Sequence, residues 1–230
     1  MTDPTIAELF DLTGRTALLS GASGFLGSAF ASALAEAGAR VLVTSRDLAT
    51  AERVAASLGG HEAGNHRGIA MDQTNEASIE AGFAEALKLS DRIDILVNNG
   101  HAALGADWSS VTGDQFQEHF RNVTGYFLLA RHVRNAAVER NHAASLVMIG
   151  SMYGVVGSYP DAYAGVCSAS PVAYHALKGG IVHMTRHLAV YWATDGVRVN
   201  CLSPGPFPSE KAPGEMVERL VQKSPMKRMG

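Results

Sequence analysis

Short apolar runs alternate with longer amphipathic stretches along most of the chain. The apolar runs are rich in Val, Ile and Leu and predict buried strands at 15–20, 40–45, 67–71, 93–98, 145–150 and 197–202. The stretches between them predict helices over 25–37, 48–58, 76–89, 114–140 and 172–194, and a shorter helix follows near 213–223. This alternation predicts an α/β fold, in which a doubly wound parallel sheet lies between helices on both faces in three layers, α/β/α.

Length and composition are those of one globular domain. The 230 residues suit a single α/β unit, so we expect residues 1–230 to form one domain. Hydrophobic residues make up 47% and charged residues 18%, which favours a packed core over disorder. The formal net charge of -3 argues against nucleic acid as a partner, because phosphate binding needs a basic face. We therefore expect a small molecule as the partner.

The cysteines and the opening segment bear on location. Cys167 and Cys201 form no CxxC or Cys/His pair with metal-ligand spacing, so we expect reduced thiols and no metal site. The first residues, "MTDPTIAELFDLTGR", lack the basic segment and apolar run of a signal peptide. No run approaches the roughly 18 apolar residues that a membrane span requires. We expect a cytoplasmic protein that does not cross a membrane.

A glycine-rich turn, "SGASGFLGSAF", joins the first predicted strand to the first long helix. Gly21, Gly24 and Gly27 are spaced GxxGxxG, and glycine permits positive φ and close approach of a ligand to the backbone. The free N–H groups and dipole at the start of the next helix favour a pyrophosphate. This is where a Rossmann-like fold places the phosphates of a dinucleotide. We expect the three glycines, with Ser23 and Leu26, to bind a dinucleotide cofactor.

The ends of the second and third predicted strands carry residues that would discriminate between cofactors. Ser45 and Arg46 follow the second strand, and an arginine there pairs with a 2′-phosphate through a forked contact. This favours NADP(H) over NAD(H), although Arg46 would also be tolerated as a solvated side chain, with Asp47 holding free ribose hydroxyls. Asp72 and Gln73 follow the third strand, where Asp72 would accept from the adenine amino group or serve only as a turn residue.

Six motifs together resemble the short-chain dehydrogenase/reductase family, in the family's order and over nearly the whole chain. They are "SGASGFLG", "NNG" at 98–100, "NVTG" at 122–125, "MIGSMYG", "YHALK" and "SPGPFPS". The opening "LFDLTGR" and the segment "VRVNCLSPGPFPS" are similar to the gluconate 5-dehydrogenase and sugar-oxidoreductase branch. The resemblance implies an NAD(P)-dependent oxidoreductase that interconverts a secondary alcohol and a ketone by hydride transfer. It also implies a homodimer or homotetramer, formed through helices 114–140 and 172–194.

Tyr174 and Lys178 lie four residues apart on the last long predicted helix, which Ser170 and Pro171 would open as N-cap and first residue. A free tyrosine has a pKa near 10, and a nearby ammonium favours its phenolate. The resemblance implies that Tyr174 exchanges the substrate proton. It further implies that Ser151 holds the substrate oxygen, that Lys178 binds the nicotinamide ribose and that Asn122 binds a water linking Lys178 to solvent.

The resemblance also implies the walls of the nicotinamide and substrate sites. Asn98 and Gly100 would bind the cofactor, and its carboxamide end would be held by Pro204, Gly205, Phe207 and Ser209. Candidate substrate residues are His101, Met152, Tyr153, Tyr159 and Tyr163, with Phe207 and Glu210 nearby. Tyrosines present an aromatic face with a polar tip, which suits a sugar, sugar acid or polyol. The same tyrosines would also suit packing of the loop or a contact between subunits.

Several departures from the family pattern keep other functions open. The GxxGxxG spacing is more common in the larger epimerase-like branch, which suggests a nucleotide-sugar epimerase or dehydratase. The Ser151-to-Tyr174 interval is longer than usual, and the family normally has a further helix and a seventh strand after "RMG". We expect the sequence to be truncated there. A cofactor-binding regulator without activity is the remaining alternative, against which the intact Ser-Tyr-Lys set argues.

Overall fold

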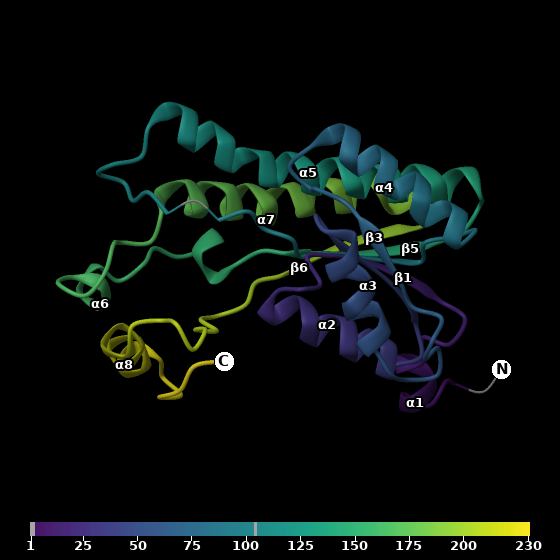
Figure 1. Ribbon diagram of the computed structural model, residues 1–230, viewed down its shortest axis with the longest axis horizontal. Helices are drawn as coiled ribbons and strands as arrows, with labels where there is room; N and C mark the ends of the chain where they lie inside the picture. Colours follow the sequence, from purple (N-terminus) through teal and green to yellow (C-terminus); the bar gives the residue numbers. More distant parts are fainter. Residues whose placement is uncertain (1–2, 104) are drawn as a thin grey trace.

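A computed structural model of the protein describes residues 3–103 and 105–230 and shows a sheet of parallel strands (Figure 1). The strands are β1 (Thr16–Ser20), β2 (Arg40–Ser45), β3 (Arg67–Ala70), β4 (Ile95–Asn98), β5 (Ala144–Ile149) and β6 (Val197–Leu202). Their order in the sheet is β3-β2-β1-β4-β5-β6, and every neighbouring pair is parallel. The predicted doubly wound sheet is confirmed, with strand bounds within two residues of those expected.

Helices cover both faces of the sheet, as predicted. They are α1 (Ile6–Phe10), α2 (Phe25–Glu36), α3 (Leu48–Ser57), α4 (Glu76–Leu89), α5 (Gly113–Glu139), α6 (Pro160–Tyr163), α7 (Val172–Trp192) and α8 (Gly214–Lys223), with 3₁₀ turns at Met152–Gly154 and Ala193–Asp195. Helices α4, α5 and α7 pack on one face and α2 and α3 on the other, where Figure 1 also places α1. The short helices α1 and α6 were not predicted.

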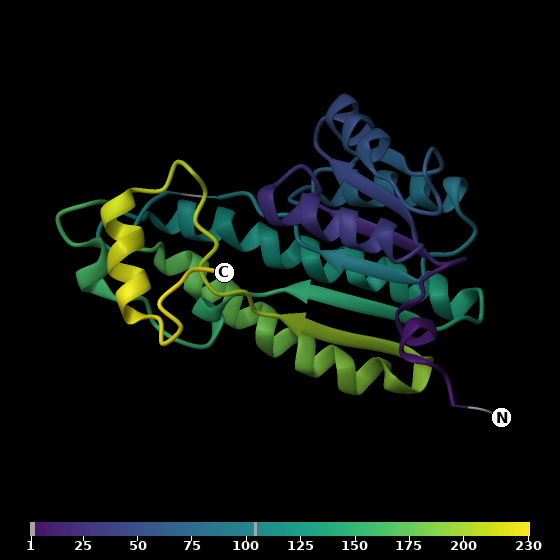
Figure 2. The same cartoon turned by 90° about the horizontal axis from the view of Figure 1, so that it is seen from below.

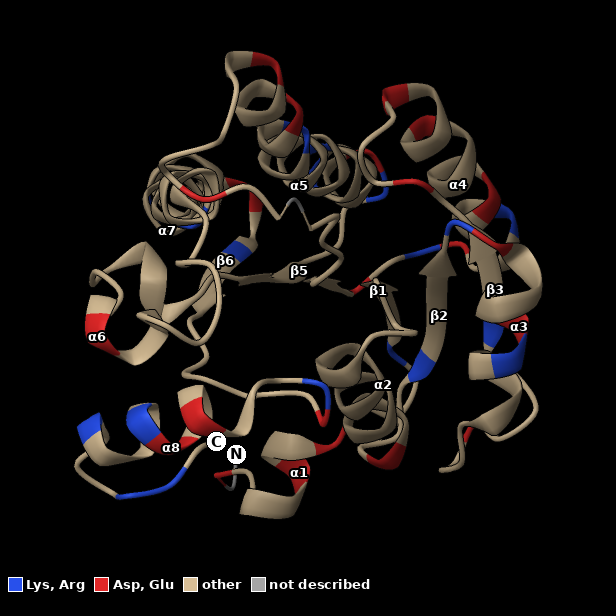
Figure 3. Ribbon diagram, turned by 60° about the vertical axis from the view of Figure 1, so that its left-hand side comes forward, with Lys and Arg blue, Asp and Glu red and all other residues tan. Residues whose placement is uncertain are grey.

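Two apolar cores lie on either side of the sheet. The larger one joins Leu96 and Leu146 of the strands to Leu129 of α5 and Leu177 of α7, all fully buried. The smaller one lies under α2 and α3 and consists largely of alanine and valine. Small side chains allow helices and strands to approach closely. Figure 3 shows most of the charged residues on the outer helices, α8 among them, which agrees with this division.

The chain turns back at the centre of the sheet. From β1 it moves outward to β2 and β3, and then returns to lay β4, β5 and β6 on the other side of β1. In open α/β sheets, ligands bind beyond the carboxyl ends of the strands at such a switch point. The ends of β1, β4 and β5 carry the glycine turn, the NNG motif and Ser151, so the topology brings the three motifs to one edge.

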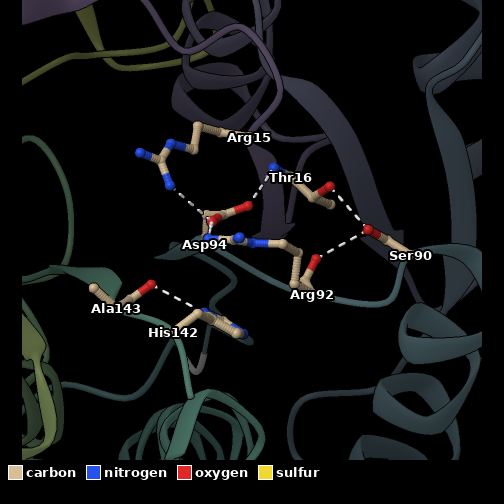
Figure 4. A network of polar contacts seen from close by, with 7 residues as sticks. All are labelled: Arg15, Thr16, Ser90, Arg92, Asp94, His142 and Ala143. Carbon is tan, nitrogen blue, oxygen red and sulfur yellow. Dashed lines mark hydrogen bonds and ion pairs between the residues drawn. The ribbon is translucent and has the colours of Figure 1, made fainter. Parts of the chain in front are cut away.

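A polar network closes the opposite edge of the sheet (Figure 4). Asp94 is 4% exposed, and its carboxylate accepts hydrogen bonds from Arg15 Nη1 at 3.3 Å and from the backbone N–H of Thr16 at 2.9 Å. Arg92 pairs with the same carboxylate, and Ser90 bonds the Thr16 hydroxyl at 2.9 Å. A buried charge needs such partners, so Asp94 joins the amino ends of β1 and β4.

The start of α7 differs from the prediction. Pro171 is the N-cap residue and Val172 the first helical one, one position later than expected, and no side chain caps the helix. The Ser170 hydroxyl instead bonds His175 Nε2 at 3.0 Å. Because the Ser170 hydroxyl bonds the imidazole of His175, it does not cap the backbone of α7. Tyr174 and Lys178 still lie one turn apart on α7.

Helices α6 and α8 pack side by side beyond the carboxyl ends of the strands (Figure 2). Arg219 of α8 donates to the carbonyls of Asp161 and Ala164 at 2.9 and 2.8 Å. Lys223 pairs with the Asp161 carboxylate at 2.6 Å and lies 4.8 Å from the ring centroid of Tyr159. These contacts tie the segment after Ser151 to the segment after the "SPGPFPS" motif at 203–209.

Candidate active site

The glycine turn is held against the NNG segment by close backbone contact. Gly21 has φ +68°, and a Cβ atom there would lie 2.5 Å from Gly100 Cα. A Cβ atom on Gly27 would lie 2.1 Å from the Gly21 carbonyl oxygen. The turn therefore requires glycine at both positions, for conformation and for space. Asn99 donates through Nδ2 to the carbonyls of Gly21 and Ser20 at 3.0 and 3.2 Å, which fixes the turn.

A cavity of about 370 Å³ lies over this turn. Its walls contain all of the cofactor residues predicted from the first three strands: Gly21, Ser23, Gly24, Leu26, Gly27, Ser45, Arg46, Asp72 and Gln73, together with Gly100. Asn99 and His101 also line it. Asn99 was not predicted as a contact residue, although it is the second asparagine of the NNG motif. A dinucleotide needs an elongated cavity at a helix N-terminus, and α2 begins at this wall.

Arg46 and Asp72, which the sequence predicted to meet the adenosine of the cofactor, both line this cavity. Arg46 is exposed at the end of β2. The carboxylate of Asp47 instead caps α3, because it accepts from Thr50 N at 2.8 Å and Thr50 Oγ1 at 2.6 Å. These contacts lower the Asp47 pKa. Asp72 accepts from Thr74 N and Oγ1 through Oδ1, so its turn role and its place in the cavity wall coexist.

A second cavity, of about 320 Å³, adjoins the first and shares Leu26, Asn99 and His101 with it. Its remaining walls include Ser151, Met152, Tyr153, Tyr174, Lys178, Pro204, Gly205 and Phe207, all predicted, and Pro206. Ser209, Tyr159, Tyr163 and Glu210 do not line either cavity. Asn98 is fully buried beneath them, where its Nδ2 donates to the Tyr126 carbonyl at 2.8 Å.

Ser151 reaches the second cavity from the end of β5. Its Oγ accepts a hydrogen bond from the backbone N–H of Tyr153 at 3.1 Å, which opens a 3₁₀ turn. This bond uses a lone pair and leaves the hydroxyl proton free to be donated into the cavity. The turn itself packs tightly on α7, because a Cβ atom on Gly154 would lie 2.6 Å from the Lys178 carbonyl oxygen. Ser151 is therefore fixed relative to Tyr174 and Lys178.

Lys178 is buried under the same cavity. Its ammonium donates to the Ile149 carbonyl at 2.7 Å and lies 5.6 Å from the ring centroid of Tyr174. Burial lowers the pKa of Lys178 to about 8. The pKa of Tyr174 is raised by its own burial, which outweighs the lowering effect of the neighbouring Ser151 hydroxyl. In the chain alone, the net shift of the Tyr174 pKa is therefore upward, whereas the sequence led us to expect a lowered value.

Asn122 lies inside α5 and is largely occupied by protein partners. Its Oδ1 accepts from Ala102 N at 2.7 Å and from Gln73 Nε2 at 3.3 Å. Its Nδ2 donates to the carbonyls of Ala102 and His119 at 3.0 and 2.9 Å. Asn122 thus holds the segment after the NNG motif against α5. Its expected role in binding a water remains a prediction.

A second histidine, which was not predicted, lies behind Tyr174. The rings of His101 and His119 are 5.1 Å apart and stand at 78°, and each also faces the Tyr174 ring edge-on, with centroids at 5.3 and 6.4 Å. His119 is 1% exposed, and neither ring nitrogen has a hydrogen-bond partner among the described residues. His101 is exposed as a whole residue, but its ring is packed among other side chains, including the rings of His119 and Tyr174. That burial, followed by the Lys178 ammonium, lowers the His101 pKa to about 3.

The predicted substrate tyrosines divide into two groups. Tyr153 lines the second cavity, and its hydroxyl bonds that of Tyr163 at 2.7 Å. Burial raises the pKa of Tyr153, and its ring stacks on His175 with centroids 4.6 Å apart. Tyr163 supports Tyr153 from behind, and Tyr159 lies under Lys223 of α8. The packing alternative therefore applies to Tyr159 and Tyr163, while Tyr153 alone reaches the cavity.

Comparison with known proteins identifies the family. The sequence pattern described as short chain dehydrogenase matches residues 15–215. The chain belongs to this family. A short-chain dehydrogenase that resembles it is the D-threitol dehydrogenase of Mycolicibacterium smegmatis, 35% identical over 203 residues, which covers 85% of this chain and 71% of the relative. The galactitol 2-dehydrogenase (L-tagatose-forming) of Cereibacter sphaeroides is 33% identical over 235 residues, which covers 96% and 85%.

A solved short-chain dehydrogenase has the same fold. The enzyme of Leptospira borgpetersenii, determined with bound NAD+, superimposes with a TM-score of 0.84 at 25% identity, over 100% of this chain and 85% of that one. The short-chain dehydrogenase described here is thus an oxidoreductase that uses a nicotinamide cofactor to interconvert an alcohol and a carbonyl compound. Across residues 3–103 and 105–230, no helix is long and apolar enough to span a bilayer.

Proposed function

We propose that this short-chain dehydrogenase is an NADP(H)-preferring enzyme that interconverts a polyol or sugar acid and its ketone, with Tyr174 as the acid/base. The single observation that carries the proposal is the meeting of Ser151, Tyr174 and Lys178 in one cavity wall, directly beside the cavity over the glycine turn. The glycine turn fits a pyrophosphate, because it lines the cavity at the first turn of α2, where the N-cap residue Gly24 carries no side chain.

The nicotinamide, when bound, supplies the hydride acceptor or donor. The protein supplies the proton chemistry and the geometry. Ser151 donates a hydrogen bond to the reacting oxygen and keeps its proton, and the bond that its Oγ accepts from Tyr153 N–H fixes its position. Tyr174 takes or gives the hydroxyl proton, and the buried Lys178 ammonium stabilises the phenolate while that proton is absent.

The preference for NADP(H) rests on Arg46. The only carboxylate next to it in sequence, Asp47, is used to cap α3 and is a poor partner for a free 2′-hydroxyl. Arg46 is exposed in the wall of the cofactor cavity, where its guanidinium can meet a 2′-phosphate. The capping role of Asp47 and the exposed position of Arg46 both favour a ribose that carries a 2′-phosphate.

The substrate class rests on the second cavity and on the relatives. The cavity wall combines the hydroxyls of Ser151 and Tyr153 with the imidazole of His101, which suits a molecule with several hydroxyl groups. The relatives described above are named for D-threitol and galactitol. We infer a substrate of this kind, a linear polyol or a sugar acid, for this chain.

A panel experiment tests the proposal. Purified protein is incubated with NADP+ or NAD+ and with tetritols, hexitols and aldonic acids, and reduced cofactor is followed by absorbance; simple secondary alcohols serve as comparison. We expect turnover with at least one polyol or sugar acid, at a kcat/KM at least about tenfold higher with NADP+ than with NAD+. Turnover of secondary alcohols alone would contradict the substrate class, and no turnover with any would contradict the function.

Self-association in the cytoplasm completes the proposal. Helix α7 exposes Val190 and Tyr191 at 74% and 67%, and α5 exposes Val138 at 44%. We propose that α5 and α7 of two chains pack together, as a homodimer or as part of a homotetramer. Light scattering after size-exclusion chromatography measures this directly, and a mass of one chain at micromolar concentration would contradict it.

A further inference from the structure

One side chain of the cofactor cavity makes contacts that the proposed chemistry does not explain. Gln73 follows β3 and lines the cavity, yet its amide group is packed against the NNG segment. A Cβ atom on Gly100 would lie 1.9 Å from Gln73 Oε1 and 2.6 Å from Gln73 Cδ. The amide of Gln73 fills the space that a side chain at position 100 would need, and glycine leaves that space free for it.

The same amide reaches Asn122. Gln73 Nε2 donates to Asn122 Oδ1 at 3.3 Å, and that oxygen also accepts from Ala102 N at 2.7 Å. Asn122 Nδ2 returns a bond to the Ala102 carbonyl at 3.0 Å. A continuous set of contacts thus runs from Gln73 through Asn122 to the segment 100–102, which carries His101 to the side of Tyr174.

The backbone of Gln73 is fixed as well. A Cβ atom on Gly125 of α5 would lie 1.8 Å from the Gln73 carbonyl oxygen, so the loop after β3 is in tight contact with α5. Gln73 is thereby held between α5 and Gly100. Its Oε1 is buried and has no hydrogen-bond partner among the described residues. An unpaired buried acceptor costs free energy. Hydrogen bonding alone therefore does not explain the position of the Gln73 amide, and its packing between Gly100 and α5 must contribute.

We infer that Gln73 is a positioning residue. Its amide is a wedge between Gly100 and Asn122 that sets the position of segment 100–102 between the cofactor cavity and Tyr174. This inference rests on the proposed function, because it assigns Gln73 a role in the same reaction. It differs from the cofactor contact that was predicted for Gln73, since the wedge acts on Asn122 and on the catalytic side of the cavity.

A double-mutant cycle tests the wedge. Gly100→Ala alone forces the flexible Gln73 amide away from Asn122, whereas Gly100→Ala in a Gln73→Ala background finds the space empty. We expect each single substitution to lower kcat about three- to tenfold, the equivalent of one hydrogen bond. We expect the double variant to be no worse than the poorer single variant. The same pattern is expected in the thermal midpoint of the cofactor-free protein and in the NADPH dissociation constant, measured by fluorescence.

Two further variants separate the parts of the inference. Gln73→Met fills the space but lacks the donor, so Gly100→Ala should remain harmful in that background. Gly125→Ala is the matched control, because it meets the Gln73 backbone oxygen, which every variant at position 73 retains. Its cost should be the same with Gln73 and with Ala at that position.

Two results would overturn the inference. The first is that the effects of Gly100→Ala and Gln73→Ala multiply as independent ones. The second is that Gln73→Met alters the thermal midpoint alone and leaves kcat and both KM values unchanged, which would make Gln73 merely structural. Failure of the proposed function is distinguishable, because wild-type protein would then have no turnover while the cofactor-free cycle could still be read.

Discussion

The Lys178 ammonium lies 5.6 Å from the centroid of the Tyr174 ring and donates its 2.7 Å hydrogen bond to the Ile149 carbonyl. The lysine is thus anchored to the end of β5, the strand that also presents Ser151. This anchoring places a positive charge beneath the phenol in the absence of any ligand. It also buries that charge, which lowers the pKa of Lys178 to about 8.

The burial of Lys178 has a cost in stability. Its pKa is about 8 in the folded chain and near 10.5 when unfolded, so the unfolded state binds more protons between these values. Stability therefore rises with pH from about 8 to 10.5, and the full cost is present below pH 8. We expect Lys178→Met to stabilise the cofactor-free protein at pH 7 by about 1–2 kcal/mol while activity is lost. Urea denaturation at pH 7 and pH 10 measures this, and a Met variant less stable at pH 7 would contradict it.

Replacement of Arg46 should change the cofactor preference without affecting the fold, because the side chain is exposed. We expect Arg46→Ser to reduce kcat/KM for NADP+ about 10- to 100-fold, the loss of a forked charge contact, and to leave that for NAD+ within about threefold. Arg53→Ser is a suitable control, since Arg53 bonds Thr50 on the surface of α3. Equal losses for both cofactors in Arg46→Ser would contradict the assignment of Arg46 to the 2′-phosphate.

His119 should be replaceable with a gain in stability. Neither of its ring nitrogens has a partner in the described chain, and its pKa is lowered, first by burial and then by Lys178. We expect His119→Leu to raise the free energy of unfolding by about 1–2 kcal/mol at pH 7.

The gain from His119→Leu should grow in acid. A lowered pKa means that the unfolded histidine takes up a proton below pH 6.5 before the folded one, so this residue reduces stability as the pH falls. Denaturation at pH 5.5 and pH 7.5 should therefore show a smaller loss for the variant than for the wild type. A variant that loses as much as the wild type would show that the imidazole finds a partner in solution.

The network around Asp94 should matter for stability and not for chemistry. Asp94 is buried at the amino ends of β1 and β4, across the sheet from Ser151, with Arg15 and Arg92 as partners. We expect Asp94→Ala to destabilise the protein by about 1–3 kcal/mol, because it leaves the buried Thr16 N–H unpaired while the half-exposed Arg15 and Arg92 regain water. The kcat of the folded fraction, measured at low temperature, should stay within about twofold. A kcat reduced in proportion to stability would contradict this separation.

The fold and much of the site follow from local patterns. Buried strands, the glycine turn and the spacing of Tyr174 and Lys178 are each set within a few residues, and they suffice to predict the sheet and the cofactor turn. The walls of the second cavity were predicted only through the family resemblance. The order of motifs along the chain then fixes which strand ends meet, because parallel strands place their carboxyl ends at one edge.

Other features depend on contacts between distant segments. His119 is an ordinary helix residue in the sequence, and only the packing of α5 against α7 brings it to Tyr174. The wedge of Gln73 against Gly100 joins positions 27 apart, and the polarity of either residue gives no sign of it. Ser209 is exposed outside the cavity wall, and burial raises the pKa of Tyr174; neither feature has a local signal in the sequence.

The most direct test of the account is the activity of Tyr174→Phe beside that of Tyr153→Phe. Both tyrosines line the same cavity, but only Tyr174 stands above Lys178. With the best substrate from the panel, the account predicts that Tyr174→Phe lowers kcat by about 10²- to 10⁴-fold, while NADPH binds with unchanged affinity. Tyr153→Phe should change KM more than kcat. Turnover of Tyr174→Phe at the wild-type rate would contradict the central claim that this phenol moves the substrate proton.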